Sequence, residues 1–233
     1  MAVETLTKTV YAKPLPEGWR WVKLAELLLS LETGTRPKGG AIGIESGIPS
    51  VSAEHMTPNG TFDFTTLRYV PEDFYEQMPH GHIQHGDILI VKDGATTGKI
   101  CIVREDFPYR KAVINEHVFL CRPDTTKVVP EYLFYWLWGA DGYGAIRSSF
   151  QGAAIGGINQ GFVKTITLPL PPLLEQQRIV SILREQMTAI ERARAAAKAR
   201  LGASEALPVA YLGEVFSKRV GSEGWQTTLL WNL

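Results

Sequence analysis

The feature that most constrains this chain is the long segment that follows Leu-Pro-Leu-Pro-Pro at residues 168–172. Pro172 suits the first turn of a helix, and Glu175 favours the positive N-terminal end of that helix. The 29 residues from Leu173 to Leu201 would form a helix of about 44 Å. Because this is longer than a domain of this size needs, the segment predicts a helical arm.

Apolar side chains recur along this arm in alternating steps of three and four residues, which predicts a seam for another helix. The alternative is a single amphipathic helix folded back on its own domain, and the length of the arm argues against it. Gly202 and Pro208 are expected to kink or break the helix before Phe216. The seam residues expected in a helix–helix or dimer contact are Ile179, Leu183, Ile190, Ala193 and Ala197.

The part of the chain before the prolines mixes strand-like runs with helical stretches. Apolar and β-branched runs between Gly, Pro and Asp predict strands at 87–91, 99–103 and 112–120. Pro and acidic residues at their starts predict helices at 71–78 and 131–138. The expected fold is therefore α+β, with a globular domain followed by a coiled-coil-like helical arm. The aromatic residues expected in its core include Trp19, Trp21, Phe119, Tyr132, Phe134 and Trp136.

Length and composition are those of a globular protein. The chain has 233 residues, of which 45% are apolar, so it can bury a core. Cys101 and Cys121 lie in strand-like runs without metal-ligand spacing, which indicates buried free thiols in a reducing compartment. The sequence shows neither a signal-peptide pattern nor an apolar run of roughly 18 residues. We therefore expect a cytoplasmic protein without a membrane segment.

Two stretches of the chain carry Lys and Arg but no Asp or Glu. The net charge of the whole chain is zero, which argues mildly against the uniformly basic surface of many nucleic-acid-binding proteins. Residues 33–44 and 142–174 nevertheless place Lys and Arg among glycines, hydroxyls and amides. Such segments suit a DNA-contacting surface, although each one taken alone is also typical of an ordinary solvent-exposed loop.

Three loops, around residues 36–38, 92–99 and 147–160, carry the candidate DNA contacts. Lysines are expected mainly to contact the backbone, whereas Arg, Asn and Gln are better candidates for base edges. The candidate DNA-binding residues are Arg36, Lys38, Lys92, Thr96, Thr97, Lys99, Arg147, Ser148, Ser149, Gln151, Asn159 and Gln160.

Two motifs that could carry chemistry do not fit their patterns. Residues 94–100, Gly-Ala-Thr-Thr-Gly-Lys-Ile, are one residue short of a phosphate-binding loop, and Ile100 replaces the hydroxyl that would bind magnesium. A tight turn between two strands explains the same glycines. The histidine-rich run at 80–87 could hold a metal but lacks a distant partner. Dinucleotide-binding and nucleophile-elbow motifs are absent from the sequence, so we expect no catalytic centre and no metal site.

Six segments of the chain carry a resemblance to known proteins: LPEGWRWVKLAEL, IPSVSAEHM, GDILIVKDGATTGKICIV, NEHVFLCRP, PEYLFYWL and INQGFVKTITLPLPPLLEQQRIVSIL. The match runs in order from about residue 15 to residue 219, and its most specific part ends in PLPPLLEQQRI. Together these segments resemble one known family, the DNA specificity subunits of type I restriction-modification systems.

The resemblance implies a non-catalytic subunit that chooses a sequence of double-stranded DNA. It implies a target-recognition domain followed by a long helix, and full-length members resemble two such units in tandem with their helices antiparallel. Separate modification subunits would bring S-adenosylmethionine and methylate adenine, and a restriction subunit, a motor-nuclease that uses ATP, would cut. The chain itself would hold no cofactor. The alternative that the residues leave open is a protein-interaction scaffold that does not read DNA.

Only one unit of the tandem pattern is present, yet Glu-Gly-Trp occurs at both 17–19 and 223–225. We interpret the chain as a tail (1–14), a target-recognition domain (15–170), a long spacer and dimerisation helix (171–219) and the start of an incomplete second repeat (220–233). Such a chain is expected to be a half-subunit or a fragment of a tandem protein. Two copies paired about a two-fold axis, as a homodimer, would recreate the tandem arrangement.

Overall fold

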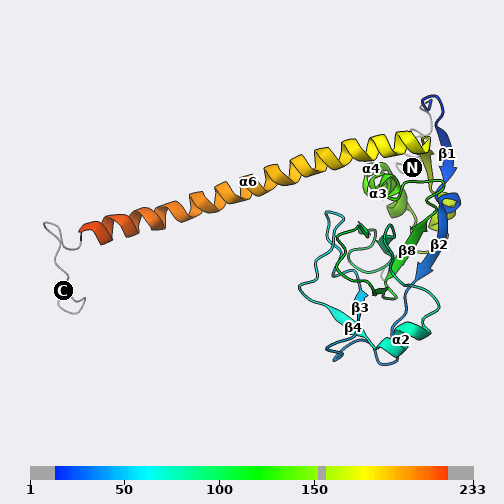
Figure 1. Ribbon diagram of the computed structural model, residues 1–233, viewed down its shortest axis with the longest axis horizontal. Coiled ribbons are helices and arrows are strands. Elements are labelled where there is room, and N and C mark those ends of the chain that lie inside the picture. The colour runs from blue at the N-terminus through cyan, green and yellow to red at the C-terminus, as the bar shows by residue number, and fades with distance from the viewer. Residues whose placement is uncertain (1–13, 152–155, 220–233) are drawn as a thin grey trace. The chain divides into compact units, whose positions relative to one another are not determined.

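The computed structural model describes residues 14–151 and 156–219 (Figure 1). The chain divides into two compact units, the first ending at Val180 and the second beginning at Ser181. The elements in order are β1 (Arg20–Lys23), the 3-10 helix η1 (Leu24–Leu27), β2 (Leu28–Thr33), β3 (Ile48–Val51), β4 (Arg68–Val70), α2 (Glu72–Gln77), β5 (Ile88–Val91), β6 (Ile100–Ile102), β7 (Val113–Ile114), β8 (Val118–Pro123), α3 (Pro130–Trp138), α4 (Ala140–Ser148), β9 (Phe150–Gln151), β10 (Gly157–Ile158), α5 (Phe162–Thr165), β11 (Thr167–Leu170) and α6 (Leu173–Arg219). This confirms the expected α+β class with a long C-terminal helix.

The centre of the first unit is an antiparallel sheet in the order β2-β8-β5-β6. Every side chain of β5 is buried, because successive side chains point to opposite faces and both faces are covered. Ile88 and Ile90 enter one hydrophobic cluster together with residues of α3. Leu89 and Val91 enter a second cluster on the opposite face. The continuous apolar run in the sequence thus reflects a strand with core on both sides.

Two smaller groups of strands complete the frame of the domain. The sheet β4-β3-β7 combines an antiparallel and a parallel pair. The strand β1 pairs antiparallel with β11, with Arg20 opposite Leu170. The first described strand therefore lies beside the residues that lead into α6.

The expected elements agree with the structure in most places. The helices at 71–78 and 131–138 correspond to α2 and α3, and the strands at 87–91 and 99–103 correspond to β5 and β6. The single strand expected at 112–120 is wrong, because residues 115–117 form a loop between β7 and β8. Among the expected core aromatics, Phe119, Tyr132 and Phe134 are buried, whereas Trp19, Trp21 and Trp136 are only partly buried.

The two cysteines are buried free thiols, as expected. Cys101 lies in β6 and Cys121 in β8. Burial raises the pKa of Cys101 to about 12 and raises that of Cys121 as well. Neither thiol is therefore a reactive nucleophile in the folded state.

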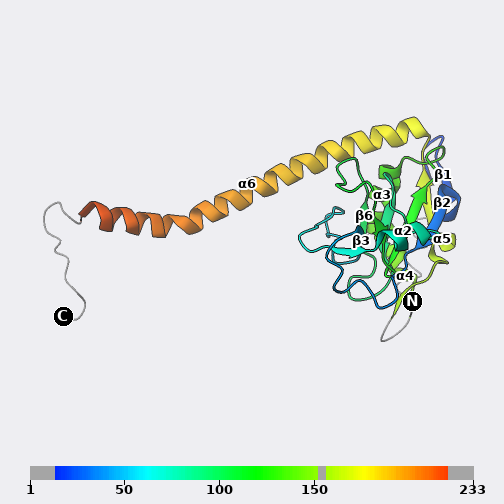
Figure 2. The same ribbon diagram turned by 60° about the horizontal axis from the view of Figure 1, so that its bottom comes forward.

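The helix α6 is continuous over its 47 residues, about 70 Å at the usual rise per residue. Figure 2 shows its ribbon unbroken. The expected break at Gly202 or Pro208 is therefore wrong, whereas a kink at these residues stays a prediction. A glycine costs about 1 kcal/mol and a proline about 3 kcal/mol inside a helix, and the good helix formers on both sides of these residues offset that cost. The start of the second repeat, expected at 220–233, lies outside the described residues.

The first two turns of α6 belong to the domain because Gln176 fastens them to it. This side chain is fully buried. Its Oε1 accepts a hydrogen bond from the Val129 amide at 2.7 Å, and its Nε2 donates to the Pro171 carbonyl at 2.9 Å. Val180 enters the core on the same side, and Ile179 packs against it.

We predict that Gln176→Ala lowers the free energy of unfolding by about 1–3 kcal/mol, because the Val129 amide loses its buried acceptor. Urea denaturation of the purified chain measures the change. The exposed neighbour supplies the matched control, Gln177→Ala. Equal effects of the two substitutions would contradict the anchoring role of Gln176.

Candidate nucleic-acid interface

Three loops of the domain meet at one end of the central sheet. In the antiparallel order of the sheet, Thr33 lies opposite Phe119, Val91 opposite Val118 and Ile90 opposite Ile100. The end of β2, the end of β5 and the starts of β6 and β8 are therefore neighbours. The loops at these strand ends carry most of the polar residues considered below, and we call this the loop end of the sheet.

The β5–β6 connection is the tight turn that its glycines predict. Gly94 and Gly98 have φ values of 85° and 87°, in the region that favours glycine. The Gly98 amide donates to the Val91 carbonyl at 2.8 Å. Thr97 is buried, and its hydroxyl donates to the Gly94 carbonyl at 2.6 Å. Thr97 thus helps to hold the turn, while Thr96 beside it is exposed. The expected DNA contacts of both threonines stay predictions.

One hollow beside this turn is basic. It has a volume of about 420 Å³, and Lys99 and Arg147 are its only charged lining residues within the described part of the chain. We call it the basic hollow; its lining is Pro58, Ala95, Thr96, Thr97, Gly98, Lys99, Ile100, Trp138, Tyr143 and Arg147. Arg147 is exposed on α4, and the Lys99 ammonium donates to the Ala53 carbonyl at 3.1 Å. The structure thus brings together residues about 50 positions apart that the sequence suggested separately.

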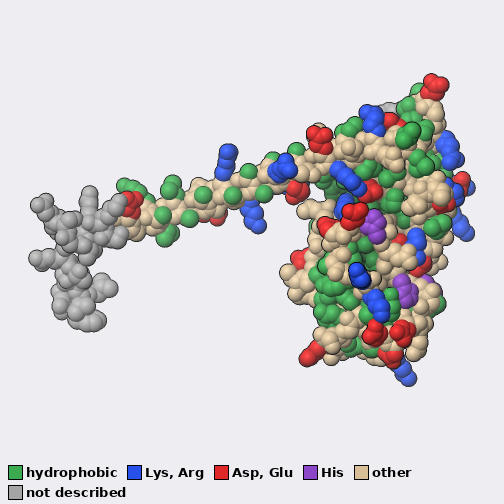
Figure 3. Space-filling view, viewed as in Figure 1, with side chains coloured by type: hydrophobic (Ala, Val, Ile, Leu, Met, Phe, Trp, Pro, Cys, Tyr) green, Lys and Arg blue, Asp and Glu red, His purple; other side chains and the backbone are tan. Residues whose placement is uncertain are grey.

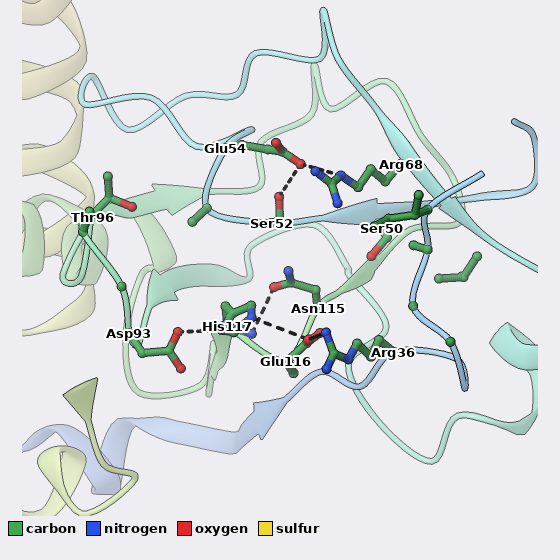
Figure 4. A pocket seen from close by; sticks show the side chains of 18 residues that line it. Arg36, Ser50, Ser52, Glu54, Arg68, Asp93, Thr96, Asn115, Glu116 and His117 are labelled. Atoms are coloured by element: carbon green, nitrogen blue, oxygen red, sulfur yellow. Dashed lines mark hydrogen bonds and ion pairs between the residues drawn. The ribbon is translucent and has the colours of Figure 1, made fainter. Parts of the chain in front are cut away.

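A larger cleft on the other side of the turn carries mixed charge. Its volume is about 740 Å³ (Figure 4). We call it the mixed-charge cleft; its lining is Arg36, Gly39, Gly40, Ala41, Ile42, Ser50, Ser52, Ala53, Glu54, Arg68, Val70, Asp93, Gly94, Ala95, Thr96, Asn115, Glu116 and His117. Ala95 and Thr96 line both sites, so the β5–β6 turn forms a wall between them.

Each arginine of the mixed-charge cleft is paired with a glutamate. Arg36 Nη1 lies 3.1 Å from Glu116 Oε1, and Arg68 Nε lies 3.1 Å from Glu54 Oε1. Figure 4 shows these pairs on opposite sides of the cleft. On the side of Glu116, His117 Nδ1 lies 2.6 Å from Asp93 Oδ1. The polar side chains of the cleft are therefore held in place by one another.

Glu54 is the centre of one of these networks. Its Oε1 accepts a hydrogen bond from the Ser52 hydroxyl at 3.2 Å and lies 3.8 Å from Nε2 of the fully buried His55. His55 Nδ1 accepts the Ser52 amide hydrogen at 2.9 Å, which assigns the ring proton to Nε2. Burial lowers the pKa of His55. The ring therefore turns a neutral N–H towards Glu54.

Other expected DNA contacts lie outside both sites. Lys92 is half-buried, with its ammonium 5.9 Å from the centre of the Phe119 ring. Ser148 and Ser149 both donate their hydroxyls to the Ala145 carbonyl. These side chains are thus engaged within the domain. The remaining ones outside the two linings are Lys38, Asn159 and Gln160, which are exposed, and Gln151, whose side chain is outside the described residues.

Sequence reasoning missed Arg68, Glu54, Asn115 and His117. A signal for two of them was present, because Asn-Glu-His at 115–117 interrupts an otherwise apolar run. Such a polar triplet between two short strands indicates a loop. Arg68 and Glu54 carried no comparable signal, since their pairing depends on how β3 and β4 align.

The histidine-rich run at 80–87 is used in hydrogen bonds and an ion pair. His82 Nε2 lies 2.9 Å from the Met78 carbonyl oxygen. Asp87 is buried and accepts two hydrogen bonds from Arg122, each of 2.9 Å. Within residues 14–151 and 156–219, no group of three or more His, Cys, Asp or Glu is arranged to hold a metal ion. In the same part of the chain, no helix has the length and apolar character to cross a membrane.

The comparisons with known proteins agree with this fold. A model of the family described as the type I restriction modification DNA specificity domain matches residues 16–197. The chain therefore belongs to the type I restriction-modification DNA specificity domain family. It is similar to a protein of Methanocaldococcus jannaschii named as the type I restriction enzyme MjaX specificity subunit, with 30% identity over 176 residues. These cover 72% of this chain and 39% of that protein.

A second relative and two solved structures extend the comparison. The type I restriction enzyme MjaVIII specificity subunit of M. jannaschii is 23% identical over 76% of this chain and 37% of its own length. A structure from a study of complex assembly and conformational transition of the type I R-M system matches 88% of this chain and 50% of its own, with 25% identity and a TM-score of 0.60. The HsdS subunit from Thermoanaerobacter tengcongensis matches 88% of this chain and 51% of its own, with 22% identity and a TM-score of 0.59. The chain thus spans between 37% and 51% of the length of these proteins.

Proposed function

We propose that this chain reads double-stranded DNA for a type I restriction-modification complex and directs adenine methylation and cleavage by partner subunits. The observation that carries the proposal is the basic hollow at the loop end of the sheet, where Lys99 and Arg147 meet without a carboxylate in the lining. Two cations on a rigid frame suit contacts to phosphates, which position a protein on DNA. Membership of the DNA specificity domain family supports the same function.

The partners and cofactors follow from this proposal. Modification subunits would supply S-adenosylmethionine and the methyl transfer, and the restriction subunit would supply ATP-driven movement and cutting. The chain would itself be non-catalytic. We place the protein in the cytoplasm, a reducing compartment that suits its two buried free thiols.

We also propose that the second unit pairs with α6 of another copy. Leu183 and Met187 are half-exposed, and Ile190 is 42% exposed and Leu201 60%. Figure 3 shows hydrophobic side chains along this part of the helix. The expected seam residue Ile179 packs on its own domain, so the proposed contact begins at Leu183 and includes Ala193 and Ala197. Two identical readers on a two-fold axis would recognise inverted copies of one half-site.

We predict that Lys99→Gln and Arg147→Gln each weaken DNA binding on all sequences to a similar degree. A plot of log K against log salt has a negative slope, and each lost phosphate contact should make that slope less steep by about 0.9. Fluorescence anisotropy with duplex DNA, in the presence of the modification subunits, measures both effects. Lys111→Gln is the matched control, because Lys111 is paired with Glu72 outside both sites. Unchanged binding by both hollow variants would remove this surface from the interface, and a wild-type complex that binds no DNA would favour a protein-interaction scaffold.

We predict that the purified chain alone does not bind S-adenosylmethionine, because the proposed function places this cofactor on the modification subunits. Isothermal titration calorimetry should record no binding heat for the chain and saturable heat once modification subunits are added. Tight stoichiometric binding to the chain alone would overturn the non-catalytic assignment.

We predict that Leu183→Glu and Ile190→Glu convert a dimer into a monomer, because each places a charge in an apolar contact. Light scattering of the full chain measures the mass. Thr188→Glu is the control, since it adds the same charge two residues from Ile190, on the opposite side of α6. Mapping of methylated adenines then tests the symmetry, because a homodimer should select an interrupted palindrome. A single asymmetric site would defeat the symmetric arrangement.

A further inference from the structure

The two sites at the loop end differ in charge, and this difference separates their roles. The mixed-charge cleft is lined by the guanidiniums of Arg36 and Arg68 and by three carboxylates. Counting only these groups, its formal charge is 2 − 3 = −1. A phosphate entering the cleft would meet more negative than positive charge. The edge of a base pair is uncharged and is not repelled in this way.

Arg68 is the cation of the cleft with the more rigid support. It lies on β4, and its backbone is opposite Ser50 of β3. Its ion pair with Glu54 uses Nε, so the two terminal nitrogens at the far end of the guanidinium are left to donate. The side chain of Arg68 is 54% exposed, which leaves this end accessible to a ligand. A guanidinium with one edge held and another edge free is oriented before it binds.

Glu54 has one further hydrogen bond on the domain side. The Ser52 hydroxyl donates to its Oε1 at 3.2 Å, and Nε2 of the buried His55 lies 3.8 Å from the same oxygen, beyond hydrogen-bond distance. Glu54 therefore contacts both Ser52, which follows β3, and Arg68 on β4. This gives Glu54 the place of a positioning residue for Arg68.

We propose that Arg68, positioned by Glu54, reads a guanine in the major groove. Its two terminal nitrogens would donate to the O6 and N7 acceptors of one guanine, the bidentate contact that distinguishes G·C from the other base pairs. The inference rests on the proposed DNA-reading function and assigns the cleft to base recognition, with the basic hollow assigned to the phosphates. Arg68 is thereby a residue that determines specificity.

The test uses the full chain with its modification subunits and a library of randomised DNA duplexes. Sequencing of the bound fraction gives the preference for each base at each position. Arg68→Lys and Arg68→Ala should lower the preference for guanine at one position of the half-site by roughly 10- to 100-fold. The other positions and the salt dependence of binding should remain unchanged. Glu54→Gln should lower the same preference in part, because the neutral amide holds Arg68 less firmly.

Two controls separate base reading from loss of structure. Glu72→Gln breaks an exposed ion pair with Lys111 outside the mixed-charge cleft and should leave every base preference unchanged. Thermal unfolding of each variant should stay near that of the wild type, since Arg68 is half-exposed. Arg68→Lys keeps the positive charge but not the planar fork, so a loss of preference in this variant reports geometry.

Three outcomes would overturn the inference while leaving DNA reading intact. If Arg68→Ala weakens all sequences equally and lowers the salt slope by about one, Arg68 contacts a phosphate. If Glu54→Gln strengthens binding to all sequences, Glu54 masks Arg68 and does not position it. If neither residue alters the preference, the cleft does not read bases. A wild-type complex that selects no sequence would instead overturn the proposed function, and this inference with it.

Discussion

The burial of β5 on both faces is the constraint on which the rest of the domain depends. A fully buried strand needs a paired strand on each edge and a hydrophobic layer on each face. For β5 the paired strands are β8 and β6, and the two hydrophobic clusters cover its faces. Once the antiparallel order β2-β8-β5-β6 is set, alternate strand ends must meet at the same end of the sheet. The surface loops gathered there are positioned by the core, although they contribute little to it.

This arrangement lets one turn serve two chemically different sites. The β5–β6 turn has the basic hollow on one side and the mixed-charge cleft on the other. In DNA recognition, positive charge supplies affinity that is insensitive to sequence, and oriented donors and acceptors supply discrimination. The proposed division of labour follows from these charges. Because the β5–β6 turn separates the two sites, it would fix the distance between the residues that read bases and the residues that contact phosphates.

A polar anchor fastens the first turns of the long helix to the first unit. The Gln176 side chain accepts a hydrogen bond from the Val129 amide and donates one to the Pro171 carbonyl. Removing it would leave these buried backbone groups without a partner, which costs free energy of folding. The first turns of α6 thus belong to the core of the domain, while later turns expose apolar side chains. One helix can therefore be an integral part of a folded domain and also offer a surface to another chain.

The sequence by itself determined what depends on neighbouring residues. Apolar runs between turn residues located β5 and β6, acidic and proline starts located α2 and α3, and the change of pattern after residues 168–172 located α6. It also marked Arg36, Thr96, Lys99 and Arg147 as polar candidates, because charge and side-chain type are visible in any one residue. The sequence wrongly predicted a single strand at 112–120 and a break of the helix at Pro208. At both places the local pattern does not show whether a polar triplet or a proline interrupts the element.

Only the tertiary structure decided which polar side chains act together. The pairing of Arg68 with Glu54 depends on the alignment of β3 and β4. Lys99 and Arg147 line the same hollow because α4 lies beside the β5–β6 turn. Thr96 and Thr97 are alike in the sequence, yet one is exposed and the other holds the turn. The physical reason is that a side chain's partners are set by contacts between residues far apart in the chain, whereas periodicity and end signals report only the few residues around each position.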